Sequence, residues 1–242
     1  TVDPLATQSG VLAALLAEQG YTGPEHVLDG KEGFSHVFDS EWRFDLLTAG
    51  LGESWRIVDC GMKFFPTEAL THTPISAVLE LVQEHDLAPD EITTVTVFSL
   101  ARAADILADP SKYDPRSKET ADHSLPWVLA AAIADRQVTP LQFTPAKLED
   151  ERIRAQLGKV KVIADPEIEK AFPALQRVRV VIETTDGRSL ERQLDYPKGD
   201  PRNPLTDSEI LGKMAALADG VAGPADVERM RDAVDRSDSF ED

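Results

Sequence analysis

The chain contains 242 residues, of which 25 are Lys or Arg and 43 are Asp or Glu, so its formal net charge is −18. This length allows one large domain or two smaller ones, and a hydrophobic content of 42% excludes general disorder. The acidic balance excludes nucleic acid as a partner, because neutralising phosphates needs clustered Lys and Arg, and it argues against docking on anionic membranes.

The first predicted element is a helix that ends at Gly20. Its apolar stripe consists of Leu5, Val11, Leu12, Leu15 and Leu16. A short helical turn is predicted over residues 25–28. We expect residues 31–53, which are rich in aromatic side chains and glycine, to be irregular or briefly helical.

From about residue 54 the hydrophobic period changes. Residues 55–59 and 91–100 are predicted strands, and a helix is predicted from Thr73, with this threonine as N-cap and Pro74 at the first helical position. A further helix is predicted over 101–108. The almost entirely apolar helix at 125–134 is expected to be buried on most sides.

The last third begins with strand patterns and ends with helices. Residues 159–163 alternate cleanly, and 177–183 with 188–196 form a predicted β-hairpin around Asp186-Gly187. One helix includes Leu211 and Leu217, and another begins at Pro224. The predicted fold class is α+β: helical segments at 1–53 and 204–242 flank an inserted mixed α/β domain at 54–203.

Signatures of metal and nucleotide chemistry are absent from the sequence. There is no Gly-rich phosphate loop, nucleophile elbow or HExxH motif, and the five histidines lack metal-ligand spacing. A single cysteine, Cys60, fits a reducing compartment. We therefore expect no metal and a cytoplasmic protein. A mitochondrial location stays open, because the sequence begins with Thr.

The segment 63–72 contains the first candidate site. Lys63 and Glu68 flank a proline, and His72 stands at a predicted helix start. A surface ion pair in a strand-to-helix connection is the more common explanation of this spacing. In the functional alternative, Lys63 binds an anion near the helix N-terminus while Glu68 or His72 moves a proton.

The segment 112–127 contains two further candidates. His123 precedes the buried helix, with Asp122 or Ser124 as its cap, and a capping cluster beside a core tryptophan is the simpler explanation. Lys112, Arg116 and Lys118 form a basic loop. A protein this acidic would need such a local patch to attract an anionic substrate, although a solvated loop explains the same residues.

Several of these segments together resemble one family. They are Gly20-Tyr-Thr-Gly-Pro24, Lys63-Phe-Phe-Pro66 with Thr71-His72, Arg116 to Trp127 with its Ala-Asp-His-Ser-Leu-Pro-Trp string, and Pro197-x-Gly-Asp-Pro-x-Asn-Pro-Leu205 followed by Lys213. In this order they resemble the MmgE/PrpD family of 2-methylcitrate dehydratases, cis-aconitate decarboxylases and related epimerases.

The resemblance implies a fold and a site. Family members are about twice as long, and this chain is expected to contain only their C-terminal half, without the catalytic residues of their N-terminal helical region. The family fold is a helical domain with an inserted α/β lid, and the active site lies in the cleft between them. Lys63, Glu68 and His123 are the expected catalytic residues, and His72, Arg116, Lys118 and Trp127 are expected to bind substrate.

The resemblance also implies an activity without metal or organic cofactor. Glutamate at position 68 is similar to the dehydratase pattern, where decarboxylases have histidine, whereas Trp127 replaces the usual family tyrosine. We expect a part of a 2-methylcitrate dehydratase-like lyase that acts on a small tricarboxylate, with its site completed by a second chain. A same-family decarboxylase or epimerase and a non-catalytic partner subunit are the alternatives.

Overall fold

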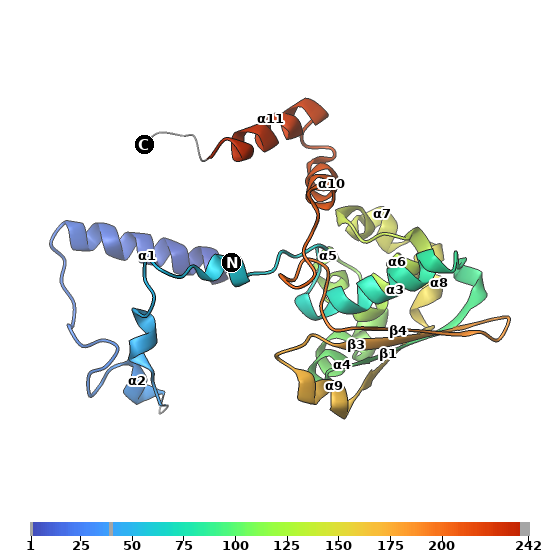
Figure 1. Cartoon of the computed structure of the whole chain (residues 1–242), viewed down its shortest axis with the longest axis horizontal. Coiled ribbons are helices and arrows are strands. Elements are labelled where there is room, and N and C mark those ends of the chain that lie inside the picture. The colour runs from blue at the N-terminus through green and yellow to red at the C-terminus, as the bar shows by residue number, and fades with distance from the viewer. Residues whose placement is uncertain (1, 39–40, 238–242) are drawn as a thin grey trace. The chain divides into compact units, whose positions relative to one another are not determined.

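A computed structural model describes residues 2–38 and 41–237 (Figure 1). The chain divides into two compact units, Thr1–Trp55 and Arg56–Asp242. Within the described ranges, no helix combines the length and the apolar character needed to cross a membrane. The predicted α+β fold class is confirmed, and the division at residues 53 and 203 stays a prediction.

The first unit is helical where it is regular. Helix α1 (Val2–Glu18) is followed by Gly20, whose φ of +86° ends the helix as predicted. Helix α2 (Phe34–Val37) and the 3₁₀ helix η1 (Phe44–Leu47) lie in the aromatic segment. The apolar stripe of α1 is exposed, with fractions between 42% for Leu16 and 58% for Leu5.

The second unit is built on a four-stranded sheet with the order β2-β1-β3-β4. Strand β1 (Ile92–Ser99) pairs in parallel with β2 (Val160–Ala164) and antiparallel with β3 (Val178–Thr184), which pairs antiparallel with β4 (Ser189–Leu194). The predicted hairpin is therefore confirmed. Gly187 supplies the positive φ (+85°) that its turn requires.

Helices cover both faces of this sheet. In Figure 1, α3 (His72–Glu84), α6 (Leu125–Asp135) and α8 (Glu151–Leu157) lie on one side, with α4 (Ala101–Leu107) and α9 (Pro166–Ala171) on the other. The remaining short helices are α5 (Lys118–Ala121), α7 (Pro145–Leu148), η3 (Ala69–Thr71), η4 (Pro89–Glu91), η5 (Pro110–Tyr113) and η6 (Pro140–Phe143).

The core of the second unit is centred on α6. Every residue from Leu125 to Ala134 is buried, which confirms the prediction from this apolar run. Ser124 caps the helix, because its Oγ accepts a hydrogen bond from the Trp127 amide at 3.0 Å. The side chains of α6 pack against α3 and α8 over the sheet.

Two sequence predictions are wrong. Residues 55–59 do not form a strand: Arg56–Asp59 is the exposed 3₁₀ helix η2, and no strand among the described residues pairs with Ile57 or Val58. Helix α3 begins at His72, so Thr73 lies inside its first turn and is not the N-cap. Thr71 is the N-cap, but its hydroxyl makes no capping bond and lies 2.7 Å from both the Thr67 hydroxyl and the Glu68 carbonyl oxygen.

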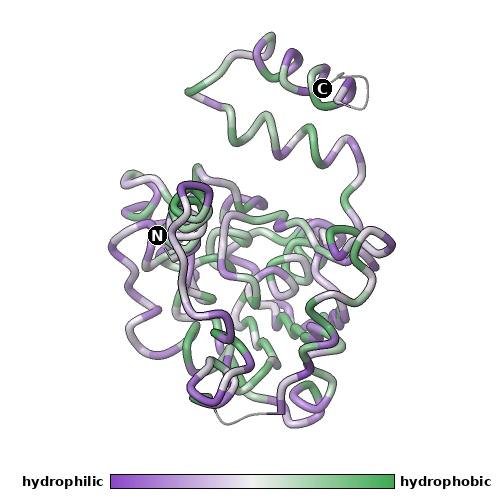
Figure 2. Tube along the Cα trace, turned by 90° about the vertical axis from the view of Figure 1, so that its left-hand side faces the viewer, coloured by the Kyte–Doolittle hydropathy of each residue, from purple (hydrophilic) through white to green (hydrophobic). Residues whose placement is uncertain are grey.

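The chain ends in two lightly packed helices. Helices α10 (Asp207–Ala218) and α11 (Pro224–Asp235), which follow one another toward the C-terminus in Figure 2, contain no buried residue. Thr206 caps α10 in a capping box with Glu209, as its hydroxyl contacts the Glu209 amide at 3.3 Å and carboxylate at 2.8 Å. Helix α11 begins at Pro224, as predicted.

Candidate active site

A cavity of about 750 Å³ lies in the second unit. Its walls are the loop 63–69, one side of α3, residues 122–123, the segment 136–140 that follows α6, and one side of α10. Charged side chains and a larger number of apolar ones share this lining. The charged members and the histidine are Lys63, Glu68, Asp122, His123, Arg136, Glu209 and Lys213.

Lys63 is held in place by two other segments. The Met62 amide donates to the Gly199 carbonyl at 2.8 Å, and the Lys213 ammonium donates to the Lys63 carbonyl at 2.5 Å. Gly199 has a φ of +94°, and a Cβ there would lie 1.9 Å from the Met62 carbonyl oxygen. The glycine of the Pro197–Leu205 motif thus permits the close approach that fixes the segment before Lys63.

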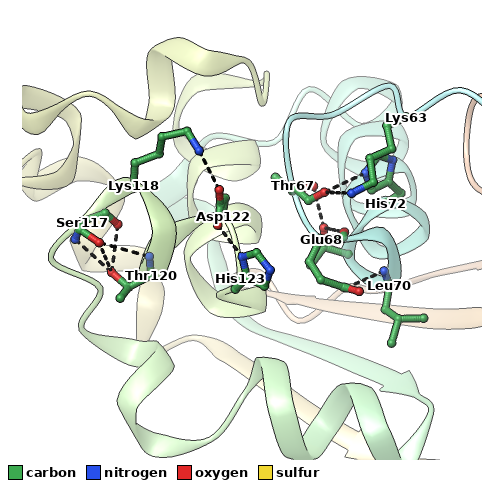
Figure 3. Close-up of polar contacts among 11 residues, drawn as sticks. Lys63, Thr67, Glu68, Leu70, His72, Ser117, Lys118, Thr120, Asp122 and His123 are labelled. Atoms are coloured by element: carbon green, nitrogen blue, oxygen red, sulfur yellow. Dashed lines mark hydrogen bonds and ion pairs between the residues drawn. The ribbon is translucent and has the colours of Figure 1, made fainter. Parts of the chain in front are cut away.

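The loop 63–69 is closed by its own hydrogen bonds. The Lys63 ammonium donates to the Thr67 carbonyl at 3.0 Å. The Glu68 carboxylate accepts the Leu70 amide at 2.6 Å and so caps η3. Both side chains line the cavity, and Glu68 is half-buried. Figure 3 shows these contacts together.

His72 lies behind this loop and is not among the lining residues. It is 3% exposed, its Nε2 is 3.4 Å from the Thr67 carbonyl, and its ring packs edge-on against Phe65. The pKa of His72 is lowered from 6.5 to about 4, chiefly by burial; the Thr67 hydrogen bond opposes this shift, and the positive charges of Lys63 and Lys213 add to it. The imidazole is therefore neutral near pH 7, and it packs against the loop through its contacts with Thr67 and Phe65.

His123 is linked to Asp122 and Lys118. One oxygen of the Asp122 carboxylate is 2.5 Å from His123 Nδ1, and the other accepts from the Lys118 ammonium at 2.9 Å (Figure 3). The Asp122 side chain is only 12% exposed, against 59% for Lys118 and 57% for His123. The bond to Asp122 raises the pKa of Lys118.

The other predicted substrate-binding residues lie outside the lining. Arg116 is paired with Asp114 at 2.8 Å and Glu149 at 3.7 Å. Trp127 is fully buried in α6. The structure thus brings Lys63, Glu68 and His123 to one cavity and leaves Arg116, Lys118, His72 and Trp127 out of its wall. The substrate-binding roles of these four residues stay predictions.

Sequence reasoning missed Asp122 and Lys213 as members of the site. The sequence indicates Asp122 as a helix cap, and its position four residues after Lys118 is the available signal of an ion pair on one helical turn. Lys213 belongs to an amphipathic helix, and no local pattern distinguishes it from a solvated lysine.

The lining contains three positive and three negative side chains, but pairing with residues outside the wall leaves it locally positive. Three charges are paired with partners: Asp122 with Lys118, Arg136 with Asp86 at 2.7 Å, and Glu209 with Lys198 at 2.9 Å. Lys63 and Lys213 then lie opposite Glu68, which leaves one net positive charge when Glu68 is ionised and two when it is protonated, in an otherwise acidic protein. The two ammonium groups, Lys63 and Lys213, are the cations that such a cavity offers to an anion.

Two family models match the sequence. Residues 65–239 match the MmgE/PrpD C-terminal domain, and residues 2–47 match the MmgE/PrpD N-terminal domain. The second match corrects the expectation that the chain contains the C-terminal half alone. The first unit thus carries sequence of the N-terminal domain.

Several curated relatives are similar over nearly the whole chain. A cis-aconitate decarboxylase-like protein of Aspergillus oryzae is 26% identical over 95% of this chain and 50% of its own length. Cis-aconitate decarboxylases of Aspergillus terreus and Homo sapiens are 25% and 26% identical over 95% and 98% of this chain, and over 49% of their own lengths. The chain thus spans about half the length of these relatives.

Proposed function

The chain belongs to the MmgE/PrpD family, and on this basis we propose that it forms part of a lyase site that eliminates water from a small tricarboxylate, as in the conversion of 2-methylcitrate to 2-methylaconitate. The observation that carries the proposal is the convergence of Lys63, Glu68 and His123 on one locally positive cavity. A tricarboxylate has more than one carboxylate with which to engage the Lys63 and Lys213 ammonium groups of this cavity.

The proposed reaction needs a base, an acid and a cation. His123 takes the proton from the carbon next to a carboxylate, the electron pair forms the carbon–carbon double bond, and the C–O bond breaks. The departing hydroxyl takes a proton from Glu68, which this step requires in its protonated form, and leaves as water; the other Glu68 oxygen accepts the Leu70 amide. Lys63 stabilises the charge that builds on the substrate carboxylate.

We further propose that a second chain, carrying the rest of the family's helical part, completes the site. The exposed apolar stripe of α1 supports this, because an apolar surface of this kind marks a protein interface. Native mass measurement with identification of each chain tests the proposal. A heteromer is expected, and a particle made of this chain alone would contradict it.

Decarboxylation is the alternative within the same family. It is favoured by the names of the relatives, cis-aconitate decarboxylases at 25–26% identity. Glu68 favours dehydration, because the resemblance places histidine at this position in decarboxylases. Product analysis on 2-methylcitrate and cis-aconitate distinguishes loss of water from loss of CO₂.

Substitution of Lys63 tests the site. In the assembled particle, Lys63→Met should lower the lyase rate by about a hundredfold or more, because one preorganised cation contributes that much to charge stabilisation. The matched control is Lys170→Met on α9, an exposed lysine paired with Glu167 outside the cavity wall, which should leave the rate unchanged. An unaltered rate in Lys63→Met would favour a non-catalytic partner subunit.

A further inference from the structure

We propose that Asp122 is a positioning residue that fixes His123 in the tautomer with its proton on Nδ1, so that Nε2 is an acceptor toward the cavity. The inference deepens the proposed function, because it rests on His123 taking the substrate proton. The tautomer itself is measurable without any activity.

The geometry around Asp122 determines where the imidazole proton lies. A carboxylate is only an acceptor, so a ring nitrogen 2.5 Å from Asp122 Oδ1 must carry its proton. Lys118 donates to the other oxygen, Oδ2, at 2.9 Å. Because the Asp122 side chain is 12% exposed, little water competes for these oxygens. Nε2, on the far side of the ring, is then left with its lone pair.

Local structure holds Asp122 in this position. It ends the one-turn helix α5, where Ser117 and Thr120 form a reciprocal capping box. The Asp122 amide donates to the Lys118 carbonyl at 2.9 Å, which aligns the two side chains at i and i+4. Two spacings in the sequence therefore place the Asp122 carboxylate beside His123: Ser117-x-x-Thr120 and Lys118-x-x-x-Asp122.

Asp122 also joins the two proton-transfer residues. Its carbonyl oxygen accepts the Glu68 amide at 3.0 Å, while its carboxylate holds His123. One residue therefore sets the position of the Glu68 loop and the orientation of the imidazole. In Figure 3, Asp122 lies between the Lys118 side and the Glu68 side of this group.

The test replaces a carboxylate, which has two acceptor oxygens, with an amide, which has one acceptor oxygen and one donor NH₂ group. In Asp122→Asn, the ammonium of Lys118 can only donate, so it attracts the amide oxygen. The amide NH₂ then points at His123 Nδ1 and requires an acceptor there, which moves the proton to Nε2. Adding Lys118→Met removes this preference, and the amide oxygen can turn back to Nδ1.

The measurement is ¹⁵N NMR of the imidazole rings in the full chain, at about pH 8, which lies above the ordinary pKa of an imidazole. Comparison with His123→Gln identifies the His123 signals. We expect mostly Nδ1–H in the wild type, mostly Nε2–H in Asp122→Asn, and a return to Nδ1–H in the double variant. Unchanged His72 signals report an intact fold, and Asp165→Asn at the N-cap of α9 is the matched control.

Two results would overturn the proposal: a wild-type protein with the proton on Nε2, or an Asp122→Asn variant whose tautomer does not move. In the assembled particle, Asp122→Asn should also lower the lyase rate by about a hundredfold or more, with recovery in the double variant. If the tautomer moves and the rate does not, the positioning role is supported and the proposed function of His123 fails.

Discussion

His72 should make the stability of the second unit depend on pH. Its folded-state pKa of about 4 lies below the ordinary value of 6.5, chiefly because the ring is buried. Between these values the unfolded chain binds a proton that the folded chain excludes. The stabilising contribution is therefore complete above about pH 6.5 and is lost as the pH falls toward 4.

The two pKa values give the size of the effect. The full shift corresponds to roughly 3 kcal/mol, and about 2 kcal/mol of it is lost between about pH 7.5 and about pH 5. In His72→Gln the side chain has no proton to gain in this pH range, so this part of the fall in the free energy of unfolding should disappear. The variant is expected to be less stable than the wild type near neutrality and to approach it in acid.

Urea unfolding at the two pH values measures the difference. A background with Trp42→Phe and Trp55→Phe leaves Trp127, buried in α6, as the fluorescent probe of the second unit. The control is His26→Gln in the first unit, where the ring is 74% exposed. If the free energies of unfolding of wild type and His72→Gln fall in parallel, the assigned pKa is wrong.

Two further substitutions test how the cavity and the core are held. Gly199→Ala should destabilise the second unit by about 2 kcal/mol or more, because its Cβ would meet the Met62 carbonyl at 1.9 Å and its φ is +94°; Gly158→Ala, with open space around its Cβ, should cost little in the same urea titration. Asp135→Ala should cost about 2 kcal/mol, because it removes the buried partner of Lys147 (2.6 Å) and leaves the amide of buried Gln142 without its 3.0 Å acceptor. Thermal unfolding that matches wild type in either variant would contradict the corresponding contact.

Elements with a strong local pattern could be predicted from the sequence. The apolar run of α6 and the alternating strands around Asp186-Gly187 each carry their own signal, so helix, hairpin and burial follow from the chain alone. Residues 55–59 show the limit of this reasoning. Trp55, Ile57 and Val58 have strand propensity, but a strand also needs a neighbour, and no strand among the described residues pairs with these exposed ones.

The candidate site was predictable only in part, because some of its contacts join segments that are far apart in the sequence. Lys63 and Glu68 are close in sequence, and their loop could be identified. The approach of Gly199 to Met62, and of Lys213 to the Lys63 carbonyl, joins segments about 140–150 residues apart. Such contacts depend on tertiary packing, which no local spacing encodes.

The charge distribution limits how this protein can bind an anion. A net charge of −18 repels a tricarboxylate at long range, but salt screens that repulsion beyond about 8 Å. Inside the cavity, Lys63 and Lys213 act at contact distance, where Lys118 and Lys198 already neutralise Asp122 and Glu209. Binding of the proposed tricarboxylate must therefore depend on short-range contacts with these two lysines, since the protein's overall field opposes the encounter.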